Sequence, residues 1–478
     1  MNFTSYEFVV FFALVVLAKG CLSQFNSQKW LLLVASCIFY LTWSVPCLLL
    51  ILFTAISDYA IARKMSRTSG AGARQRLLIL SLTSNLGLLA FFKYANFFLE
   101  NVGAAINALG GHIPSWHANI ILPPAISFYT FASLSYVLDV YYERMPACES
   151  ARDYALFITF FPKLLSGPIM RARELLPQFA ARPTVTLEDV EAGLTYILIG
   201  AVKKLVIADH VASHVNLIFG SPTEYDGFTL LLGAVGYAIQ IYCDFSGYTD
   251  IAIGCGRILG FKFPDNFKMP YSAANITEFW RRWHITLSRW FRDYLFLPLE
   301  IATRNNPSAL LRVSLNMMAT MLLCGLWHGA SWTFVIWGGV HGAALAIHKI
   351  WSTLNPLGSL ANKKGFQLLW APFSHLLTLS VVVFALIFFR AQSIPDAMVF
   401  LHRIFTFAHD GTRLMSLYIL SAAVPLVLIH LIVNKDRNLA EELPRMSLAP
   451  QITGYAGLLF LLVVLGSTDS GAFIYFQF

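Results

Sequence analysis

The chain has 478 residues, of which 57% are hydrophobic and only 13% are charged, whereas soluble domains carry roughly 25% charged residues. Its mean hydropathy is +0.62, so the composition excludes an ordinary soluble globular protein and indicates a membrane protein. The formal net charge of +8 would suggest a nucleic-acid partner for a soluble protein. Basic residues in cytoplasmic loops explain it here, and we expect no nucleic-acid partner.

Uncharged apolar runs of about 18 to 20 residues recur along the chain, and each is long enough to cross a hydrocarbon core of about 30 Å as a helix. Helices satisfy their own backbone polar groups in lipid, and the sequence lacks the hairpin turns and alternating segments of a transmembrane barrel. We therefore predict an all-α polytopic membrane protein with about ten to twelve transmembrane helices. The first run follows a stretch without positive charge, residues 1–7, so we expect a retained spanning helix and no signal peptide.

The basic loops predict the orientation of the chain. The densest one, residues 63–76, contains five basic residues and no acidic residue, so the positive-inside rule places it in the cytoplasm. Counting back through three apolar runs puts the N-terminus outside and a first loop with Lys19 and Lys29 inside. Four further basic clusters suggest additional cytoplasmic loops, at residues 171–182, 203–204, 363–364 and 435–437.

Nothing in the sequence divides the chain into separate parts. It has no internal repeat, low-complexity tract or long polar linker, which favours a single integral membrane domain over residues 1–478. The seven cysteines include no Cys-x-x-Cys and lie mostly within apolar runs, so we expect packing residues, with neither a disulfide framework nor a metal site. Pro123-Pro124, Gly167-Pro168 and Pro264 interrupt apolar stretches, and broken helices at membrane depth suggest a cavity.

Residues 278–295 combine charge with aromatic side chains. On one helix at about 100° per residue, aromatic and aliphatic side chains occupy one side and four arginines fall within an arc of about 100° opposite them: Arg281, Arg282, Arg289 and Arg292. We expect this helix at the membrane interface or dipping into the protein from the cytoplasmic side. His284 lies at the edge of the aromatic side, where an anchoring helix would carry Leu or Phe. It is either a hydrogen-bonded core histidine or a functional group.

The 36 residues between Arg312 and Lys349 contain no charged side chain, and as one helix they would measure about 54 Å, nearly twice the membrane. The chain must turn within them, and we predict the break at residues 329–331, with Ser331 as the N-cap of the next helix. His328 stands immediately before this break. A titratable group at such a place is a functional-site hypothesis, although a structural histidine or a proton pathway is also compatible with it. We interpret His341 as packing and His348 as interfacial.

Three long motifs, rich in rare residues, carry a resemblance to a known family: residues 279–288 (FWRRWHITLS), 291–294 (FRDY) and 326–332 (LWHGASW). They resemble the membrane-bound O-acyltransferases, in particular the branch that includes the alginate O-acetylation membrane proteins and the D-alanyl transfer proteins of teichoic acid modification. Further similar stretches make the match densest over residues 121–348: 126–131, 166–169, 242–250, 263–267 and, at the end of the chain, 473–478. One departure follows Pro298-Leu299, where residues 300–305 (EIATRN) replace a Gly-Gly-Asn-Arg-like turn.

The resemblance implies a ring of tilted helices, with re-entrant or interfacial helices around a central tunnel. It identifies His328 with the family's essential histidine and His284 with the second histidine. A neutral imidazole, with a reference pKa of about 6.5, suits removal of a hydroxyl proton near pH 7. We hypothesise that His328 is the base and that His284 positions the acyl donor or polarises its carbonyl. Cys324 and Ser331 are the alternatives for a covalent carrier.

The implied donor is a cytoplasmic acyl thioester such as acetyl-CoA, without a tightly bound cofactor. The arginines at 281, 282, 289 and 292 could attract its phosphates, and we place Trp283, Trp327 and Ser331 in the same donor or tunnel region. The acyl group, most simply acetyl, would cross the bacterial cytoplasmic membrane to a polysaccharide such as alginate or to an extracytoplasmic acetyltransferase partner. Membrane lipids are the other expected partners.

Two alternative functions remain open at this point. One is D-alanyl transfer from a carrier protein to a cell-envelope polymer. The other, from a different class, is a proton-coupled transporter in which the histidines relay protons. Transporters usually show repeat symmetry and acidic residues at the midplane; the chain has no repeat, and Asp139, Asp244 and Asp250 could be structural.

Overall fold

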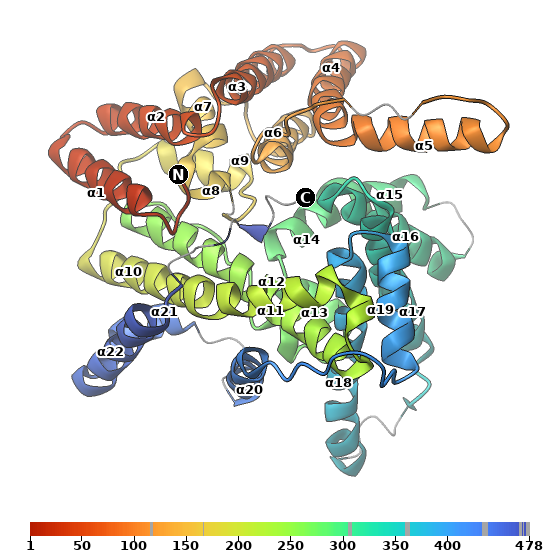
Figure 1. The fold of residues 1–478 in the computed structure, drawn as a ribbon. Coiled ribbons are helices and arrows are strands. Elements are labelled where there is room, and N and C mark those ends of the chain that lie inside the picture. The colour runs from red at the N-terminus through yellow and green to blue at the C-terminus, as the bar shows by residue number, and fades with distance from the viewer. Residues whose placement is uncertain are drawn as a thin grey trace. The chain divides into compact units, whose positions relative to one another are not determined.

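The computed structural model describes residues 1–114, 118–165, 167–304, 308–358, 364–432, 438–467, 471 and 473–474. Within these ranges the regular elements are all helices (Figure 1), apart from one isolated bridge between Tyr225 and Thr412. The all-α prediction is therefore confirmed. The expectations that concerned Ser166, Asn305, Lys363, residues 435–437 and residues 475–478 lie outside the described residues.

The chain forms two compact units. The first contains Met1–Ile197 and Asp250–Pro264, and the second contains Leu198–Thr249 and Asp265–Phe478. The prediction of a single domain stays a prediction. The first unit holds the helices α1 (Tyr6–Cys21), α2 (Phe25–Leu41), α3 (Val45–Ser66), α4 (Ala71–Leu89), α5 (Ala95–Ala108), α6 (Ile126–Tyr141), α7 (Ala151–Thr159), α8 (Phe161–Leu164), α9 (Ala172–Leu175) and most of α10 (Leu187–Ala201).

The second unit contains the rest of the helical chain. Its helices are α11 (Asp209–Gly220), α12 (Gly227–Ile258) up to Thr249, α13 (Ile276–Arg282), α14 (Ile285–Phe291), α15 (Leu297–Ala302), α16 (Ala309–His328), α17 (Trp332–Leu354), α18 (Lys364–Arg390), α19 (Ile394–Phe405), α20 (Leu417–Ile432), α21 (Leu439–Glu442) and α22 (Leu448–Leu465). Short π-helical turns follow three of the α-helices, at Ala90–Tyr94, Val202–Ala208 and Arg292–Phe296.

Six of the described helical segments are both long and apolar enough to cross a membrane: Val45–Ser66, Ala71–Ala108, Gly227–Ile258, Ala309–His328, Gly365–Arg390 and Leu448–Leu465. This confirms a polytopic helical membrane protein. Other apolar runs form shorter helices, such as α1 with 16 residues and α2 with 17.

Buried polar groups hold the first unit together. Asp58 of α3 is fully buried and accepts hydrogen bonds from Ser81 at 2.6 Å, from Asn85 at 2.7 Å and from Ser133. Because the three donors lie on α4 and α6, this one carboxylate connects three helices. The desolvation of a buried carboxylate is tolerated only when its oxygens are satisfied in this way.

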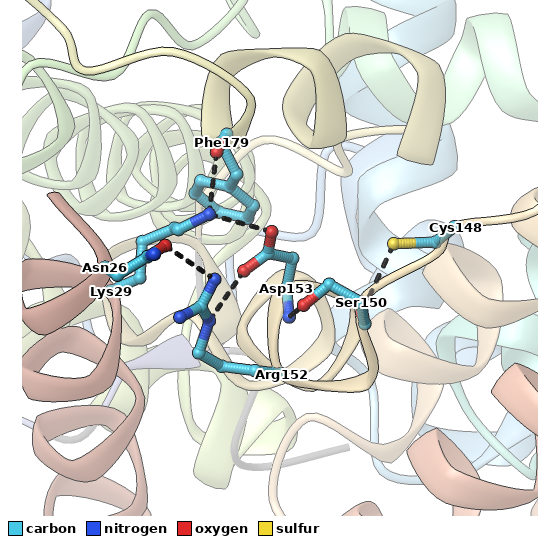
Figure 2. Close-up of polar contacts among 7 residues, drawn as sticks. All are labelled: Asn26, Lys29, Cys148, Ser150, Arg152, Asp153 and Phe179. Atoms are coloured by element: carbon cyan, nitrogen blue, oxygen red, sulfur yellow. Dashed lines mark hydrogen bonds and ion pairs between the residues drawn. The ribbon is translucent and has the colours of Figure 1, made fainter.

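Lys29, expected in a short cytoplasmic loop, instead lies within α2 with only 5% of its surface exposed. Its Nζ is 2.9 Å from Asp153 Oδ2 and donates to the carbonyl oxygen of Phe179 at 3.0 Å. Figure 2 shows Arg152 on the other oxygen of the same carboxylate, at 2.8 Å. The charge of Lys29 is thus compensated inside the protein and is not that of an exposed loop.

The predicted break after His328 is confirmed. Helix α16 ends at His328 and α17 begins at Trp332, with the Ser331 hydroxyl accepting a hydrogen bond from the Thr333 N–H at 3.3 Å. The two helices pack backbone to backbone: a Cβ at Gly325 would lie 2.2 Å from the carbonyl oxygen of Phe334. This close contact fixes the end of α16 that carries His328.

The prediction of one helix over residues 278–295 is wrong. The segment is divided into α13, α14 and the π-helical turn Arg292–Phe296, and His284 between the first two has left-handed backbone angles, φ 41° and ψ 55°. The break has a physical cause, because the Ile285 N–H donates to the carbonyl oxygen of Asn266 at 2.9 Å instead of continuing the helix. The four arginines therefore do not share one face.

Candidate active site

His328 is buried at the end of α16 with 4% of its surface exposed. Its imidazole lies among three aromatic rings, in edge-to-face geometry, with centroids 4.9 Å from Trp327, 4.9 Å from Trp337 and 5.2 Å from Phe389. Trp337 comes from α17 and Phe389 from α18. The packing of these helices thus fixes the ring of His328 in an apolar environment.

His284 is fully buried at the N-cap position of α14. A positive φ costs a non-glycine residue of order 1–3 kcal/mol and is usually retained where surrounding contacts enforce it, often at functional sites. Here the contacts are the backbone bond to Asn266 and the perpendicular ring of Phe245, whose centroid is 4.7 Å from that of His284. The unusual backbone directs the imidazole into the protein.

Asn266 determines the tautomer of His284. Its Oδ1 accepts from the Thr286 N–H at 3.2 Å and from the Thr286 hydroxyl at 2.8 Å, so it is the amide oxygen that faces His284 Nδ1 at 3.1 Å. The proton must then lie on Nδ1, and Nε2 carries a lone pair. Among the described residues this buried Nε2 has no hydrogen-bond partner. Burial lowers the pKa of His284 to about 3, which keeps the ring neutral.

Trp327 brings the two predicted histidines together. Its ring centroid is 6.3 Å from that of His284 and 4.9 Å from that of His328. Two imidazoles from different helices therefore border one indole. Trp283, the other tryptophan predicted at the site, is buried and lines a small cavity of about 10 Å³ beside His328, which is room for about one water molecule.

A third histidine, interpreted from sequence as packing, belongs to the same cluster. His341 of α17 lines the small cavity with His328, and its ring is 4.8 Å from Trp337, which also contacts His328. Its one sequence signal was the spacing of thirteen residues from His328 in an uncharged run, and this does not reveal that the hairpin returns it to the site.

A second, larger cavity of about 160 Å³ is lined mainly by residues of α14 and α16. Its walls include Cys324, one helical turn before His328, and Trp280, whose ring is 5.2 Å from His341. Arg292 is at its rim, exposed and 2.7 Å from Asp293. An apolar space with a cation at its edge, ending one turn from a buried histidine, suits a long ligand with a charged end.

The other predicted donor residues are dispersed. Arg281 and Arg289 are exposed, while Arg282 is held by Glu278 at 2.9 Å. Ser331 caps α17. Of the residues that depart from the family pattern after Pro298-Leu299, residues 300–302 form the end of α15. Glu300 accepts a hydrogen bond from Asn316 of α16 at 2.6 Å.

Two of the three acids considered for a proton relay, Asp139 and Asp244, are engaged in ion pairs. Asp244 Oδ1 is 2.5 Å from Lys204 Nζ, and its Oδ2 accepts from the Ile474 N–H at 2.9 Å. Asp209 shares the same lysine at 2.8 Å. Asp139 is buried, 3.6 Å from Arg144. Each of these three carboxylates thus has a cationic partner.

Fold and site together define a polytopic helical membrane protein with a buried histidine cluster next to an apolar cavity. The chain belongs to the membrane-bound O-acyltransferase family, MBOAT, whose sequence model matches residues 73–390. It is therefore an acyltransferase, and the resemblance seen in the motifs is confirmed.

The relatives of this chain include bacterial O-acetylation proteins. A probable alginate O-acetylase of Pseudomonas aeruginosa is 40% identical over 413 residues, which cover 85% of this chain and 75% of the relative. A peptidoglycan O-acetyltransferase of Helicobacter pylori is 36% identical over 417 residues, covering 82% and 75%. A teichoic acid D-alanyltransferase of Bacillus subtilis is 29% identical over 242 residues, covering 50% and 61%.

Proposed function

We propose that this acyltransferase moves an acetyl group from a cytoplasmic thioester to a hydroxyl of an extracytoplasmic polysaccharide, or to a partner acetyltransferase that completes the transfer. The observation that supports this most is the pair of buried imidazoles, His284 and His328, which both border the ring of Trp327. In the balanced reaction, the hydroxyl oxygen bonds to the acyl carbon, the carbon–sulfur bond breaks, and the hydroxyl proton ends on the released thiol.

His328 is the proposed general base. It would accept the hydroxyl proton as the oxygen attacks and return it to the leaving thiolate, a role worth about 10² to 10⁴ in rate. Its ring is enclosed by Trp327, Trp337 and Phe389, which exclude water from the reacting groups.

His284 is the proposed donor-positioning residue. Of its two expected roles, polarising the acyl carbonyl requires an N–H on Nε2, whereas the bond to Asn266 puts the proton on Nδ1. The neutral ring instead offers a lone pair, which suits an amide N–H such as those in the arm of coenzyme A. We therefore retain the positioning role and withdraw the polarising one.

The cavity of about 160 Å³ is the proposed donor site. Its depth reaches Cys324, close to His328, and Arg292 at its rim could pair with a donor phosphate. The nearby exposed Arg289 would add to this attraction. Trp280 and Trp283 would have to move for the acyl group to pass from this cavity to His328, through what we propose is the family's central tunnel.

Acetyl is favoured over D-alanyl as the transferred group. The relatives named for O-acetylation match over 82–85% of this chain at 36–40% identity, whereas the D-alanyltransferase matches over 50% at 29%. Alginate is one candidate polymer. We place the protein in the bacterial cytoplasmic membrane with residues 63–76 in the cytoplasm and the N-terminus outside, following the positive-inside rule.

The test uses purified protein in lipid nanodiscs with radiolabelled acetyl-CoA and a soluble oligosaccharide acceptor. We expect thiol release that depends on the acceptor and is abolished by His328→Ala. The same variant should leave exopolysaccharide unacetylated in a strain that lacks the native protein. Acetylation that persists with His328→Ala, or the absence of label transfer from acetyl-CoA to the acceptor, contradicts the proposal.

A further inference from the structure

A long groove between α17 and α18 takes no part in the proposed chemistry. Its volume is about 1120 Å³, slightly more than the roughly 300–1,000 Å³ of most small-molecule pockets. Small and apolar side chains form its walls, among them Ala343, Ala344, Leu377 and Phe384, and no Asp, Glu, Lys or Arg lines it. Such a surface fits a hydrocarbon ligand.

The groove has the length of a lipid chain region. Its wall on α18 runs from Trp370 to Phe384, about 21 Å of helix at 1.5 Å per residue, which is more than the roughly 15 Å depth of one leaflet. This wall lies within the candidate membrane span Gly365–Arg390. At one end of the groove, the rings of Trp370 and Trp351 stack with their centroids 6.3 Å apart. Tryptophan side chains favour the level of the lipid headgroups.

That end of the groove is also positively charged. The hydroxyl of Thr277 is 2.9 Å from Nδ1 of His348, a lining residue. Arg281 follows Thr277 by one turn of α13, and Lys349 follows His348 directly, and both are exposed. Among the described residues neither cation has an acidic partner, since the nearest acid along α13, Glu278, is bound to Arg282.

We propose that this groove binds one anionic phospholipid of the surrounding membrane. Its acyl chains lie between α17 and α18, and its phosphate lies between Arg281 and Lys349. A zwitterionic lipid would leave Arg281 and Lys349 without a net counter-charge. A water-soluble ligand would not reach a groove whose wall lies within a membrane span. Basic sites between helices at the cytoplasmic side are known to suit anionic headgroups.

The experiment is native mass spectrometry of the full-length protein in detergent, titrated with phosphatidylglycerol or phosphatidylcholine. Wild type should retain one phosphatidylglycerol per chain and prefer it by at least about tenfold, given two cations near the phosphate. Ser380→Trp and Ala344→Trp fill the groove from its two walls and should lose both lipids. Replacing Arg281 and Lys349 together by Gln should remove the preference while chain binding persists.

Leu376→Trp is the matched control, because Leu376 is 65% exposed on α18 and does not line the groove. It should bind lipid as wild type does, and equal melting temperatures of Ser380→Trp and the control would show an intact fold. The proposal fails if either groove-filling variant keeps the lipid, if wild type binds both lipids equally, or if a second copy of the chain occupies the groove. None of these readouts depends on acyl transfer.

Discussion

Replacing Asn266 by Leu tests the assigned tautomer of His284. Asn266 is 1% exposed and its Oδ1 accepts three hydrogen bonds, one from His284 and two from Thr286. At about 1 kcal/mol for each bond, the free energy of unfolding should fall by about 3 kcal/mol. Without this acceptor, the proton of His284 is no longer held on Nδ1, and the hydrogen bond from the acyl donor to Nε2 is weakened. We expect a loss of about 1.4 kcal/mol in the binding free energy of the donor, which raises the KM for the donor about tenfold.

The assay measures KM for the acyl thioester at fixed acceptor concentration, together with the melting temperature in the same nanodiscs. Asn85→Leu is the control. It removes the buried hydrogen bond that the Asn85 amide donates to Asp58 in the first unit, and it leaves the contacts of the histidines unchanged. We expect both variants to melt earlier and only Asn266→Leu to change the donor KM. An Asn266→Leu enzyme with the donor KM of wild type would refute the tautomer assignment.

Three further predictions concern the chemistry and the packing. The imidazole of His284 has a pKa of about 3 in the folded protein against 6.5 for the free side chain, so the stability it contributes is complete above pH 6.5 and is lost as the pH falls toward 3; the melting temperature of wild type should drop over this interval more steeply than that of His284→Gln. Gly325→Ala should cost about 1–3 kcal/mol through the clash with the facing carbonyl, measured by thermal unfolding, whereas Gly339→Ala, with its nearest neighbour at 3.6 Å, should be neutral. Lys204→Met leaves two buried carboxylates without their cation and should lower the free energy of unfolding by about 3–5 kcal/mol; an unchanged denaturation curve would show that the cluster contributes nothing.

Much of the helical organisation was predictable because hydrocarbon imposes simple rules. An uncharged run of 36 residues is too long for one crossing, so a turn within it followed from length. The turn residues Gly329, Ala330 and Ser331 then placed it next to His328. The pairing of His328 with His284 came from motifs and not from periodicity. Physical reasoning about a single helix could not have placed them on one indole.

Two features of the site were not predictable from local patterns. Helical periodicity assumes continuous right-handed backbone, and His284 interrupts it because Asn266, eighteen residues earlier, binds the next N–H. The motif containing Asn266 was noticed, but nothing in it indicates a contact with an imidazole. His341 was missed for the same reason, since its place in the cluster depends on how closely α17 folds back on α16.

Under the proposed thioester mechanism, the tight aromatic enclosure of His328 has a cost and a benefit. A space for about one water molecule allows little wasteful hydrolysis while the acceptor is absent. With His328 as the proposed base, the same enclosure requires indole and phenyl rings to move aside in each catalytic cycle. The turnover rate would then be limited by side-chain rearrangement. The rate of wasteful hydrolysis would depend on how often the rings open when no acceptor is bound.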